Sequence, residues 1–295
     1  MDDLGRGSEA RAAMKSPSET AEFQRILHET GSYRTDPARL PSRMDRMFGR
    51  FDTWYYLKLA RILYLGHRAV IRGEFDTKVW AAHSLAFLSA LEDIGATLDI
   101  SGVEHPVKLG RPAVFIGNHM SMLESFLLPA ILLHVDHIAA VIKKGLLKYP
   151  FVSSIARASD PICVGRRNPK EDLRTVLDDG KKALSGGRSV VLFPQATRSA
   201  AFDPASFNTL GVKLAKSAGA PVIPLALKTD FQRNGSIIKD IGPLDRSKTI
   251  YFKFGEPLAV TGTGKDANER VARFIADSLR EWGGEVLEPK TRETQ

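Results

Sequence analysis

The sequence predicts an α/β protein in which a mixed, mostly parallel sheet is flanked by helices. Its 295 residues are 43% hydrophobic and 26% charged, as in a globular chain long enough for one large domain or two small ones. From about residue 97 onward, short β-rich runs alternate with helical stretches, which is typical of α/β domains. Before that point only helical patterns occur, so we expect a helical region ahead of the sheet.

The N-terminal part is predicted to hold a tail followed by helices. Residues 1–18 start with acidic side chains and lack the apolar core of a signal peptide, so we expect a disordered tail. Residues 19–96 are expected to form a helical, membrane-associating region, with helices over 19–30, 42–72 and 77–95. The second of these helices is expected to break near Gly49.

Residues 97–288 are predicted to form the α/β domain, followed by a frayed tail at 289–295. The strands are expected at 97–101, 113–117, 137–142, 161–165, 189–193, 222–227 and 249–254. The helices are expected at 121–133, 143–148, 170–185, 207–218 and 266–282.

Several classes of protein are excluded by the residues that are present. Cys163 is the only cysteine, which excludes a disulfide scaffold and a cysteine-based zinc site. His134 and His137 flank Asp136 without a further ligand set, so we predict no metal site and interpret them as a turn. The run TGTGKD fails as a phosphate loop because Asp266 stands where Ser or Thr is required. No nucleic-acid-binding signature occurs, so nucleic acid is not an expected partner.

The net charge of +8 points to an anionic partner, and its distribution is uneven. Residues 1–110 are neutral, so the whole surplus lies in residues 111–295. Within the neutral part, segment 34–72 holds nine Arg and Lys against three Asp, a local charge of +6.

No segment is predicted to cross a membrane. The uncharged stretch 79–91 is shorter than the roughly 20 residues that a spanning helix needs. In helix 54–71, one stripe carries basic residues and the rest of the circumference is apolar and aromatic. Such a helix lies on a membrane surface or buries its apolar face in the protein core, and both interpretations stay open at this point. The basic stripe consists of Lys58, Arg61, Arg68 and Arg72.

The turn after strand 113–117 carries the strongest chemical signal. Ser121 and Glu124 form the pattern S-x-x-E, which is a capping box that opens a helix. Alternatively, His119 pairs with Glu124, which requires His119 to lie on the turn before the helix, because five helical positions would separate the two side chains by about 140°. A histidine held by a carboxylate at one ring nitrogen can use the other as a general base.

Three further blocks follow in order, ICVGRR (162–167), FPQATRS (193–199) and PVIPLAL (221–227). With His119 and Glu124, these blocks resemble the glycerolipid acyltransferases typified by 1-acylglycerol-3-phosphate acyltransferase, which carry NHxxxxD, a block ending in Arg, FPEGTRS and a Val-Pro-rich block. The resemblance covers about residues 97–260, and Lys144 in KKGLLKYP and FGEPL at 254–258 add to it.

The resemblance implies a role for each matching residue. His119 would be the catalytic base and Glu124 the carboxylate that orients it. The residues expected to bind substrate are Lys144, Arg166, Gln195, Thr197 and Arg198. The implied substrates are acyl-CoA or acyl carrier protein and a lysophospholipid, at an anionic membrane surface, with no metal or other cofactor. The implied location is the cytoplasmic face of a membrane, with peripheral attachment.

Three positions depart from the family pattern. Glu124 replaces Asp and lengthens the carboxylate arm by one methylene. Gln195 replaces Glu, so we expect a negative charge to be missing beside Arg198, and Ala196 replaces a Gly. These changes leave two alternatives open, an acyltransferase with another lysolipid or an aminolipid as acceptor, and a catalytically silent lipid-binding homologue.

Overall fold

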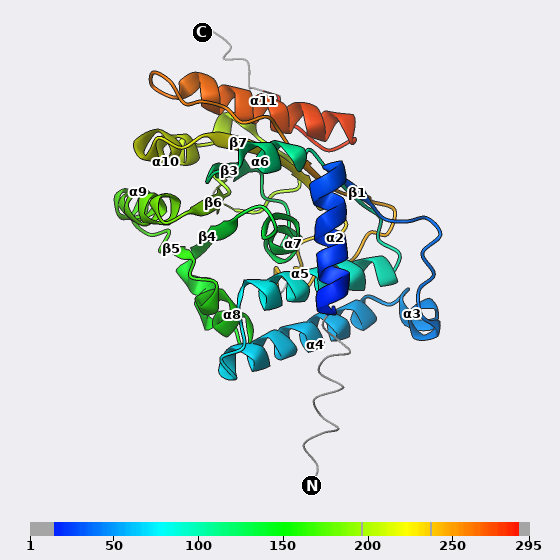
Figure 1. Cartoon of the computed structure of the whole chain (residues 1–295). Helices are drawn as coiled ribbons and strands as arrows, with labels where there is room; N and C mark the ends of the chain where they lie inside the picture. Colours follow the sequence, from blue (N-terminus) through cyan, green and yellow to red (C-terminus); the bar gives the residue numbers. More distant parts are fainter. Residues whose placement is uncertain (1–14, 196, 237, 289–295) are drawn as a thin grey trace.

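Eight strands form one mixed sheet in the computed structural model, which describes residues 15–195, 197–236 and 238–288 (Figure 1). Their spatial order is β1-β2-β8-β7-β3-β6-β4-β5. The strands are β1 (Tyr33–Arg34), β2 (Leu98–Ser101), β3 (Val114–Gly117), β4 (His137–Lys143), β5 (Ile162–Val164), β6 (Arg188–Leu192), β7 (Val222–Lys228) and β8 (Ile250–Phe254). Strands β3 to β7 run parallel, whereas β8 is antiparallel to β7. The predicted α/β fold with a mixed, mostly parallel sheet is therefore confirmed.

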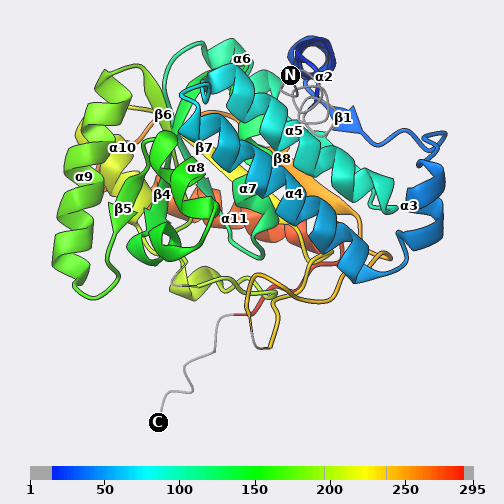
Figure 2. The ribbon, with the colours of Figure 1, turned by 90° about the horizontal axis from the view of Figure 1, so that it is seen from below.

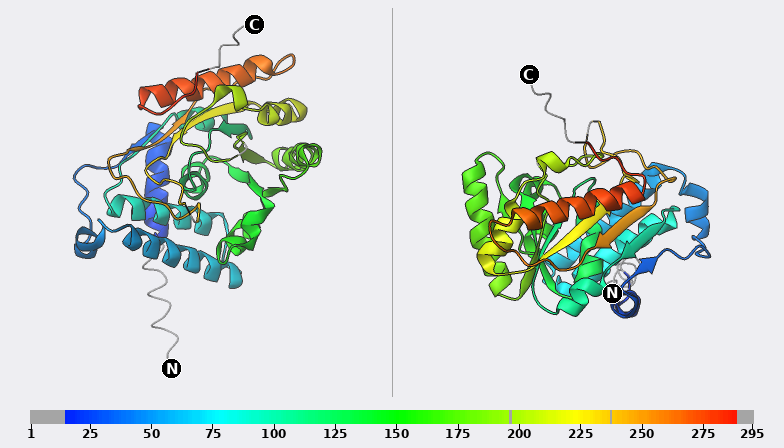
Figure 3. Two further views of the ribbon diagram at one scale, coloured as in Figure 1. Left: turned by 180° about the vertical axis from the view of Figure 1, so that it is seen from behind. Right: turned by 90° about the horizontal axis from the view of Figure 1, so that it is seen from above.

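Helices cover both faces of the sheet. Because side chains alternate along a strand, Val114 and Ile116 of β3 face one hydrophobic cluster and Phe115 faces the other. The first cluster is closed by α9 (Pro169–Ser185), α10 (Leu210–Ala218) and α11 (Lys265–Glu281). The second face is covered by α7 (Leu123–Leu132), with α2 (Pro17–Thr30), α4 (Asp52–Ile71) and α5 (Thr77–Asp93) packed beyond it. Figure 2 shows α4 and α5 side by side on this face, and Figure 3 shows α11 on the opposite face.

The uncharged stretch 79–91 belongs to α5, which lies between α4 and α7. Every residue of α5 from Ala81 to Glu92 is buried, which accounts for its apolar character without a membrane. Gly66 allows α4 to approach closely, because a Cβ atom there would lie 2.3 Å from Nε2 of His83. Among the described residues, no helix combines the length and the apolar character needed to cross a membrane.

The first helix begins earlier than predicted. Ser16 caps α2 in a reciprocal capping box, where its hydroxyl accepts the N–H of Glu19 and Glu19 accepts the N–H of Ser16. These contacts and the neighbouring Lys15 hold the pKa of Glu19 down at about 2. The predicted tail 1–18 therefore ends too late, because the helix starts at Pro17. Residues 1–14 of that tail, and the predicted tail 289–295, lie outside the described residues.

Most other boundaries agree with the predictions to within about two residues. The break near Gly49 is confirmed, since α3 (Arg43–Phe48) ends there and α4 follows. Helix α10 starts three residues later than predicted, because the side chain of Asn208 accepts the N–H of Leu210. The predicted helix 143–148 is a 3₁₀ turn, η1 (Lys144–Lys148). Short elements without a readable period were missed: β1, α6 (Glu104–Leu109), α8 (Val152–Ala158) and η2 (Pro204–Ser206).

The N-terminal helices share their core with the sheet and do not form a separately packed domain. Phe23, Tyr55 and Ile62 belong to the same cluster as Phe115 and Phe252. The predicted boundary near residue 96 therefore separates two types of secondary structure within one packed unit.

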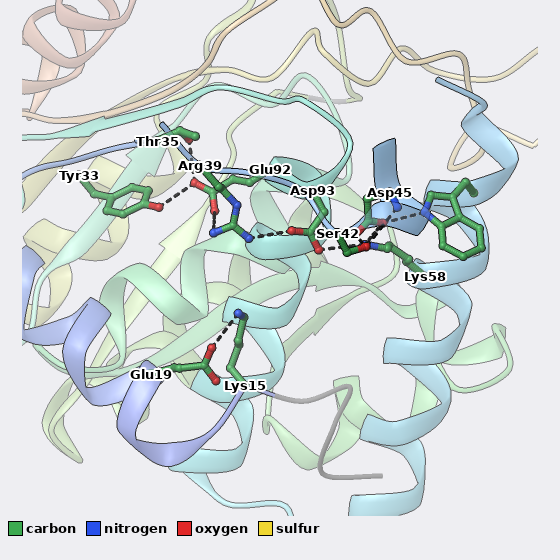
Figure 4. A network of polar contacts seen from close by, with 11 residues as sticks. Lys15, Glu19, Tyr33, Thr35, Arg39, Ser42, Asp45, Lys58, Glu92 and Asp93 are labelled. Atoms are coloured by element: carbon green, nitrogen blue, oxygen red, sulfur yellow. Dashed lines mark hydrogen bonds and ion pairs between the residues drawn. The ribbon is translucent and has the colours of Figure 1, made fainter. Parts of the chain in front are cut away.

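A polar network joins the loop after β1 to α4 and α5 (Figure 4). Lys58 was expected on the exposed basic stripe of α4, but its Nζ lies 2.5 Å from Asp45 and 2.9 Å from Asp93. Arg39 binds Glu92 and Asp93 of α5 in the same network. The network thus neutralises part of the +6 charge of segment 34–72 within the protein.

Candidate active site

The predicted site residues lie along one edge of the sheet, at the carboxyl ends of its parallel strands. His119 follows β3 and Thr229 follows β7, whereas Phe193, Gln195 and Arg198 follow β6. Lys144 follows β4 and Arg166 follows β5. In open α/β sheets, ligands bind at this edge because the strand-to-helix turns leave a crevice there. The parallel order of the strands therefore brings residues together that are far apart in the chain.

His119 and Glu124 form the predicted pair. Nδ1 of His119 lies 2.9 Å from Oε2 of Glu124, and His119 precedes the helix, since α7 begins at Leu123. Because a carboxylate only accepts hydrogen bonds, this contact places the proton of the ring on Nδ1. No hydrogen bond to Nε2 occurs within the described ranges, so Nε2 keeps its lone pair available.

Glu124 is fully buried and accepts hydrogen bonds from several directions. Its Oε1 accepts the backbone N–H groups of Met120, at 3.0 Å, and Ser121, at 2.9 Å. It also accepts the hydroxyl of Thr229, whose own oxygen accepts the hydroxyl of Ser121. Glu124 therefore accepts the backbone N–H of Ser121, which is one half of the predicted capping box, and binds His119 at the same time. The capping box and the His119–Glu124 pair are thus parts of one arrangement. These donors compensate the buried carboxylate.

Three further residues hold the turn that carries His119. The side chain of Asn118 donates to the carbonyl of Leu227 and accepts the N–H of Leu227, which ties the turn to β7. The ring of Phe193 stacks on the imidazole of His119 at 4.6 Å and an interplanar angle of 5°. The amide oxygen of Gln195 accepts the backbone N–H of His119 at 2.6 Å. The imidazole is therefore fixed by its backbone, by one ring face and by one ring nitrogen.

The arginine of the third block has an acidic partner, contrary to the expectation of a missing negative charge. Nη1 of Arg198 lies 2.7 Å from Oδ1 of Asp240, in the connection between β7 and β8. The side-chain oxygen of Gln195 instead accepts the backbone N–H of His119, which an uncharged amide oxygen is able to do. The side chain of Thr197 is exposed and lies 3.5 Å from Nζ of Lys239. Ala196 lies outside the described residues.

Lys144 and Arg166 are exposed and lie at the far end of this edge. Arg166 has a positive φ of 60°, which is unusual for a residue other than glycine. The two oxygens of Asp172 accept the N–H groups of Gly165 and Arg166, each at 2.8 Å, and stabilise this turn. Within the described part of the chain, no hydrogen bond or ion pair joins Lys144 to His119, Glu124 or Arg198. The structure thus joins Glu124 and Gln195 to His119, and the backbone N–H of Ser199, next to Arg198, donates to the carbonyl of His119 at 3.0 Å. Lys144 and Arg166 lie farther along the same sheet edge, after β4 and β5.

The histidines near residue 136 do not assemble a metal site. Asp136 accepts the hydroxyl of Ser189, and His137 contacts Thr77. Burial lowers the pKa of His134 to about 4. Among residues 15–195, 197–236 and 238–288, no group of three or more His, Cys, Asp or Glu side chains could hold a metal ion.

Sequence reasoning missed Phe193, Thr229, Asp172 and Asp240. Phe193 belongs to the third block and could have been noted there, although nothing in the block indicates that its ring stacks on His119. Thr229 and Asp240 lie 105 and 42 residues from the groups that they contact, Glu124 and Arg198. No local pattern links residues at such separations, so only the fold could reveal them.

Comparison with known proteins agrees with the geometry. Residues 98–228 match the family model described as Acyltransferase. The 1-acyl-sn-glycerol-3-phosphate acyltransferase of Pseudomonas aeruginosa is 27% identical over 219 residues, which cover 73% of this chain and 78% of that protein. The protein of the same name from Borreliella burgdorferi is 27% identical over 187 residues, which cover 63% of this chain and 71% of the relative.

A solved structure shares the fold. The 1-acyl-sn-glycerophosphate (LPA) acyltransferase PlsC from Thermotoga maritima superposes with a TM-score of 0.57 and 19% sequence identity. The match covers 81% of this chain and 97% of that one. The ordered blocks, their assembly at one sheet edge and the matches to the family model and to the named relatives lead to one conclusion: residues 98–228 carry an acyltransferase domain, and the protein is an acyltransferase.

Proposed function

We propose that this acyltransferase moves a fatty acyl group from acyl-CoA or acyl carrier protein to the free hydroxyl of a lysophospholipid. The favoured acceptor is 1-acylglycerol-3-phosphate, the substrate in the names of the relatives, and the reaction is a step of phospholipid biosynthesis. The observation that carries the proposal is the His119–Glu124 contact, in which Nε2 of the imidazole has no hydrogen-bond partner among the described residues. This arrangement is that of a general base.

The proposed mechanism uses only groups of the protein and the substrates. Nε2 of His119 takes the proton of the acceptor hydroxyl while that oxygen attacks the thioester carbonyl. Glu124 stabilises the imidazolium that forms. The C–S bond then breaks, and the departing sulfur receives the proton from the imidazolium. Every proton transfer is thus supplied by His119, and the mechanism requires no metal or other cofactor.

Arg198 is the proposed ligand of the acceptor phosphate. Its guanidinium is partly exposed and lies on the turn whose first residues hold His119, so an acceptor bound there would present its hydroxyl near Nε2. A guanidinium offers a planar fork of donors that matches phosphate oxygens. Arg166 and Lys144, which follow β5 and β4 at the same sheet edge, would extend the positive surface toward the donor or the acceptor.

Peripheral attachment to the cytoplasmic face of an anionic membrane is supported by one face of α4. Leu57, Tyr64 and Ile71 are exposed and recur every seven residues, so they form one stripe. Arg61 and Arg68 are exposed beside Leu57 and Tyr64. An apolar stripe beside a basic one is the surface that an interfacial helix requires. The opposite face, with Tyr55, Leu59 and Ile62, is buried in the core. Under this proposal α4 therefore packs against the core with one face and contacts the membrane with the other.

Release of free thiol from acyl-CoA in the presence of 1-acylglycerol-3-phosphate, other lysophospholipids and an aminolipid tests the proposal. We expect turnover with the phosphate monoester and its loss in His119→Ala, with the thermal unfolding of the variant close to that of the wild type. Wild-type turnover in His119→Ala would contradict the assignment of the base. The absence of turnover with every acceptor and donor, together with binding to anionic liposomes, would favour a silent lipid-binding homologue.

A further inference from the structure

A short loop between η1 and α8 presents two exposed aromatic side chains beside α4. Tyr149 and Phe151 of this loop, loop 149–151, are 47% and 40% exposed, and α8 lies next to α4 (Figure 1). A single exposed apolar side chain is common on protein surfaces, whereas a group of them marks a binding surface. The proposed mechanism of acyl transfer uses neither aromatic residue.

The backbone of Phe151 is in a strained conformation. Its φ is 62° and its ψ is −47°, and the N–H of Val152 donates to the carbonyl of Pro150 at 2.7 Å, which closes a γ-turn around Phe151. This form of the γ-turn is rare, because a residue with a Cβ atom is crowded at positive φ, and glycine would avoid the cost. A phenylalanine at this position therefore points to a role for its ring.

Contacts with α4 hold the ring of Phe151 at the surface. It packs edge-on against Tyr64 and His67, at 5.8 Å and 5.2 Å between ring centroids. The hydroxyl of Ser154 donates to the carbonyl of Phe151 and accepts the Nδ1–H of His67, each at 2.8 Å. Loop 149–151 and α4 therefore form one continuous surface.

Loop 149–151 widens the apolar stripe of α4 on the side away from the arginines. At 100° per residue, Arg68 lies about 40° from Tyr64 in one direction and His67 lies about 60° from it in the other. Because Phe151 contacts His67, the loop borders the stripe on this second side. The surface thus consists of a basic row, the stripe with Leu57, Tyr64 and Ile71, and then the loop.

The charges around this surface indicate an anionic partner. Neither segment 53–72 nor segment 144–158 contains Asp or Glu, and both contain several Lys and Arg residues. Lys148 is exposed next to Tyr149, and Arg68 is exposed beside Tyr64. Aromatic rings bordered by cations suit the interface of an anionic bilayer, where the rings reach the acyl boundary and the cations meet the lipid phosphates.

We propose that loop 149–151 is a second membrane-binding element, which inserts Tyr149 and Phe151 into the interface of an anionic bilayer beside α4. The inference rests on the proposed function, of which membrane attachment is a part, and goes beyond it by adding an element outside α4. The five residues of η1 connect Lys144, at the edge of the sheet that holds the candidate site, to the loop. They span about 10 Å, so insertion of the loop brings this end of the edge close to lipid-borne substrates.

The test removes both rings and keeps the turn. In the double variant Tyr149→Ser/Phe151→Gly, glycine adopts the positive φ at position 151, so we expect thermal unfolding close to that of the wild type. Affinity for vesicles of phosphatidylglycerol and phosphatidylcholine in equal parts should fall about tenfold or more. Tenfold corresponds to about 1.4 kcal/mol, which about 55 Å² of apolar surface supplies, and two partly exposed rings offer more than that.

Leu287 provides the matched control. It is 44% exposed, and its N–H donates to the carbonyl of Phe202, which belongs to the cluster on the opposite face of the sheet from α4. Leu287→Ser should therefore bind vesicles as the wild type does. In a Cys163→Ser chain, an environment-sensitive fluorophore on Phe151→Cys should shift its emission to shorter wavelength with vesicles, and the same label on Leu287→Cys should not.

The outcomes separate this inference from the proposed function. Vesicle binding of the double variant equal to that of the wild type, or an equal loss in Leu287→Ser, would overturn the inference. A double variant that also loses a dimer seen in the wild type by light scattering would assign the surface to a second copy of the chain and overturn it as well.

Thiol release with a short-chain 1-acylglycerol-3-phosphate that stays dissolved in water should be the same in wild type and double variant. A wild type that transfers the acyl group in solution and does not bind vesicles would overturn the inference and leave the acyl transfer standing. The absence of transfer to every acceptor would remove the proposed acyl transfer, while the vesicle measurement still decides on the loop.

Discussion

Replacement of Glu124 by Gln tests the proposed catalytic pair, His119 and Glu124, most directly. The carboxylate of Glu124 accepts hydrogen bonds from Met120, Ser121, Thr229 and His119, and every one of these partners is a donor. A glutamine of nearly the same size has one accepting oxygen and one donating NH₂ group. If its oxygen keeps the backbone and Thr229 contacts, its NH₂ faces Nδ1 of His119.

This change reverses the tautomer of the imidazole. Nδ1 must then accept, so the proton of the neutral ring moves to Nε2, the atom that should take the proton of the acceptor hydroxyl. General base catalysis contributes about 10²- to 10⁴-fold, and we expect kcat to fall within that range. The KM values of donor and acceptor should change little, because Glu124 is fully buried and exposes no surface to which a substrate could bind.

The assay is thiol release at saturating donor over a series of acceptor concentrations, with thermal unfolding measured in parallel. Glu92→Gln is the matched control, because Glu92 is equally buried and accepts the hydroxyls of Tyr33 and Thr35. This control should lose stability and keep its kcat. A kcat for Glu124→Gln within about threefold of wild type, or an equal loss in Glu92→Gln, would refute the tautomer argument.

Three other predictions follow from the described contacts. Arg198→Ala should raise the KM of the acceptor about tenfold or more, as expected for a lost hydrogen bond to a charged group, without changing the KM of the donor. Arg233→Ala, at an exposed position, is the control. If both variants raise the acceptor KM equally, Arg198 does not bind the acceptor. The double variant Arg61→Glu/Arg68→Glu on α4 should reduce sedimentation with anionic liposomes. The control, Lys181→Glu/Lys182→Glu on α9, makes the same charge change and should reduce it less. Equal reductions would show that α4 is not the membrane contact. Burial lowers the pKa of His83 from 6.5 to about 4. As the pH falls, the histidine is therefore protonated in the unfolded chain before it is protonated in the folded protein. The free energy of unfolding should accordingly decrease as the pH falls from 6.5 toward 4. Denaturant unfolding should show that this loss amounts to about 2 kcal/mol between pH 7 and pH 5, and that it is smaller in His83→Gln; an identical pH dependence in both proteins would contradict the assignment.

Much of the fold was predictable because its signals are local. Periods of 2 and 3.6 residues placed the seven expected strands and the longer helices within a few residues, and Gly49 marked the break between α3 and α4. The elements that escaped prediction are short, such as β1 with two residues, and owe their structure to neighbours rather than to a period.

The surface of α4 shows where such reasoning ends. Helical geometry correctly places Arg61, Arg68 and Arg72 on one side, but it also placed Lys58 with them. Lys58 instead binds Asp45 and Asp93, because two buried or half-buried carboxylates from other elements lie beside it. The side chain of lysine is long and flexible, so its position depends on the carboxylates within its reach. Those carboxylates are known only from the packing of the helices.

The sequence by itself determined the fold class and the pairing of His119 with Glu124, since the two residues lie within one strand-to-helix turn whose geometry follows from a five-residue spacing. Only the tertiary structure decided what surrounds the pair. The hydroxyl of Thr229 on Glu124, the amide of Gln195 on His119 and the carboxylate of Asp240 on Arg198 all reach the site from other turns. The physical reason is that parallel strands distant in the sequence end at the same sheet edge, so contacts that complete the site depend on strand order and not on spacing along the chain.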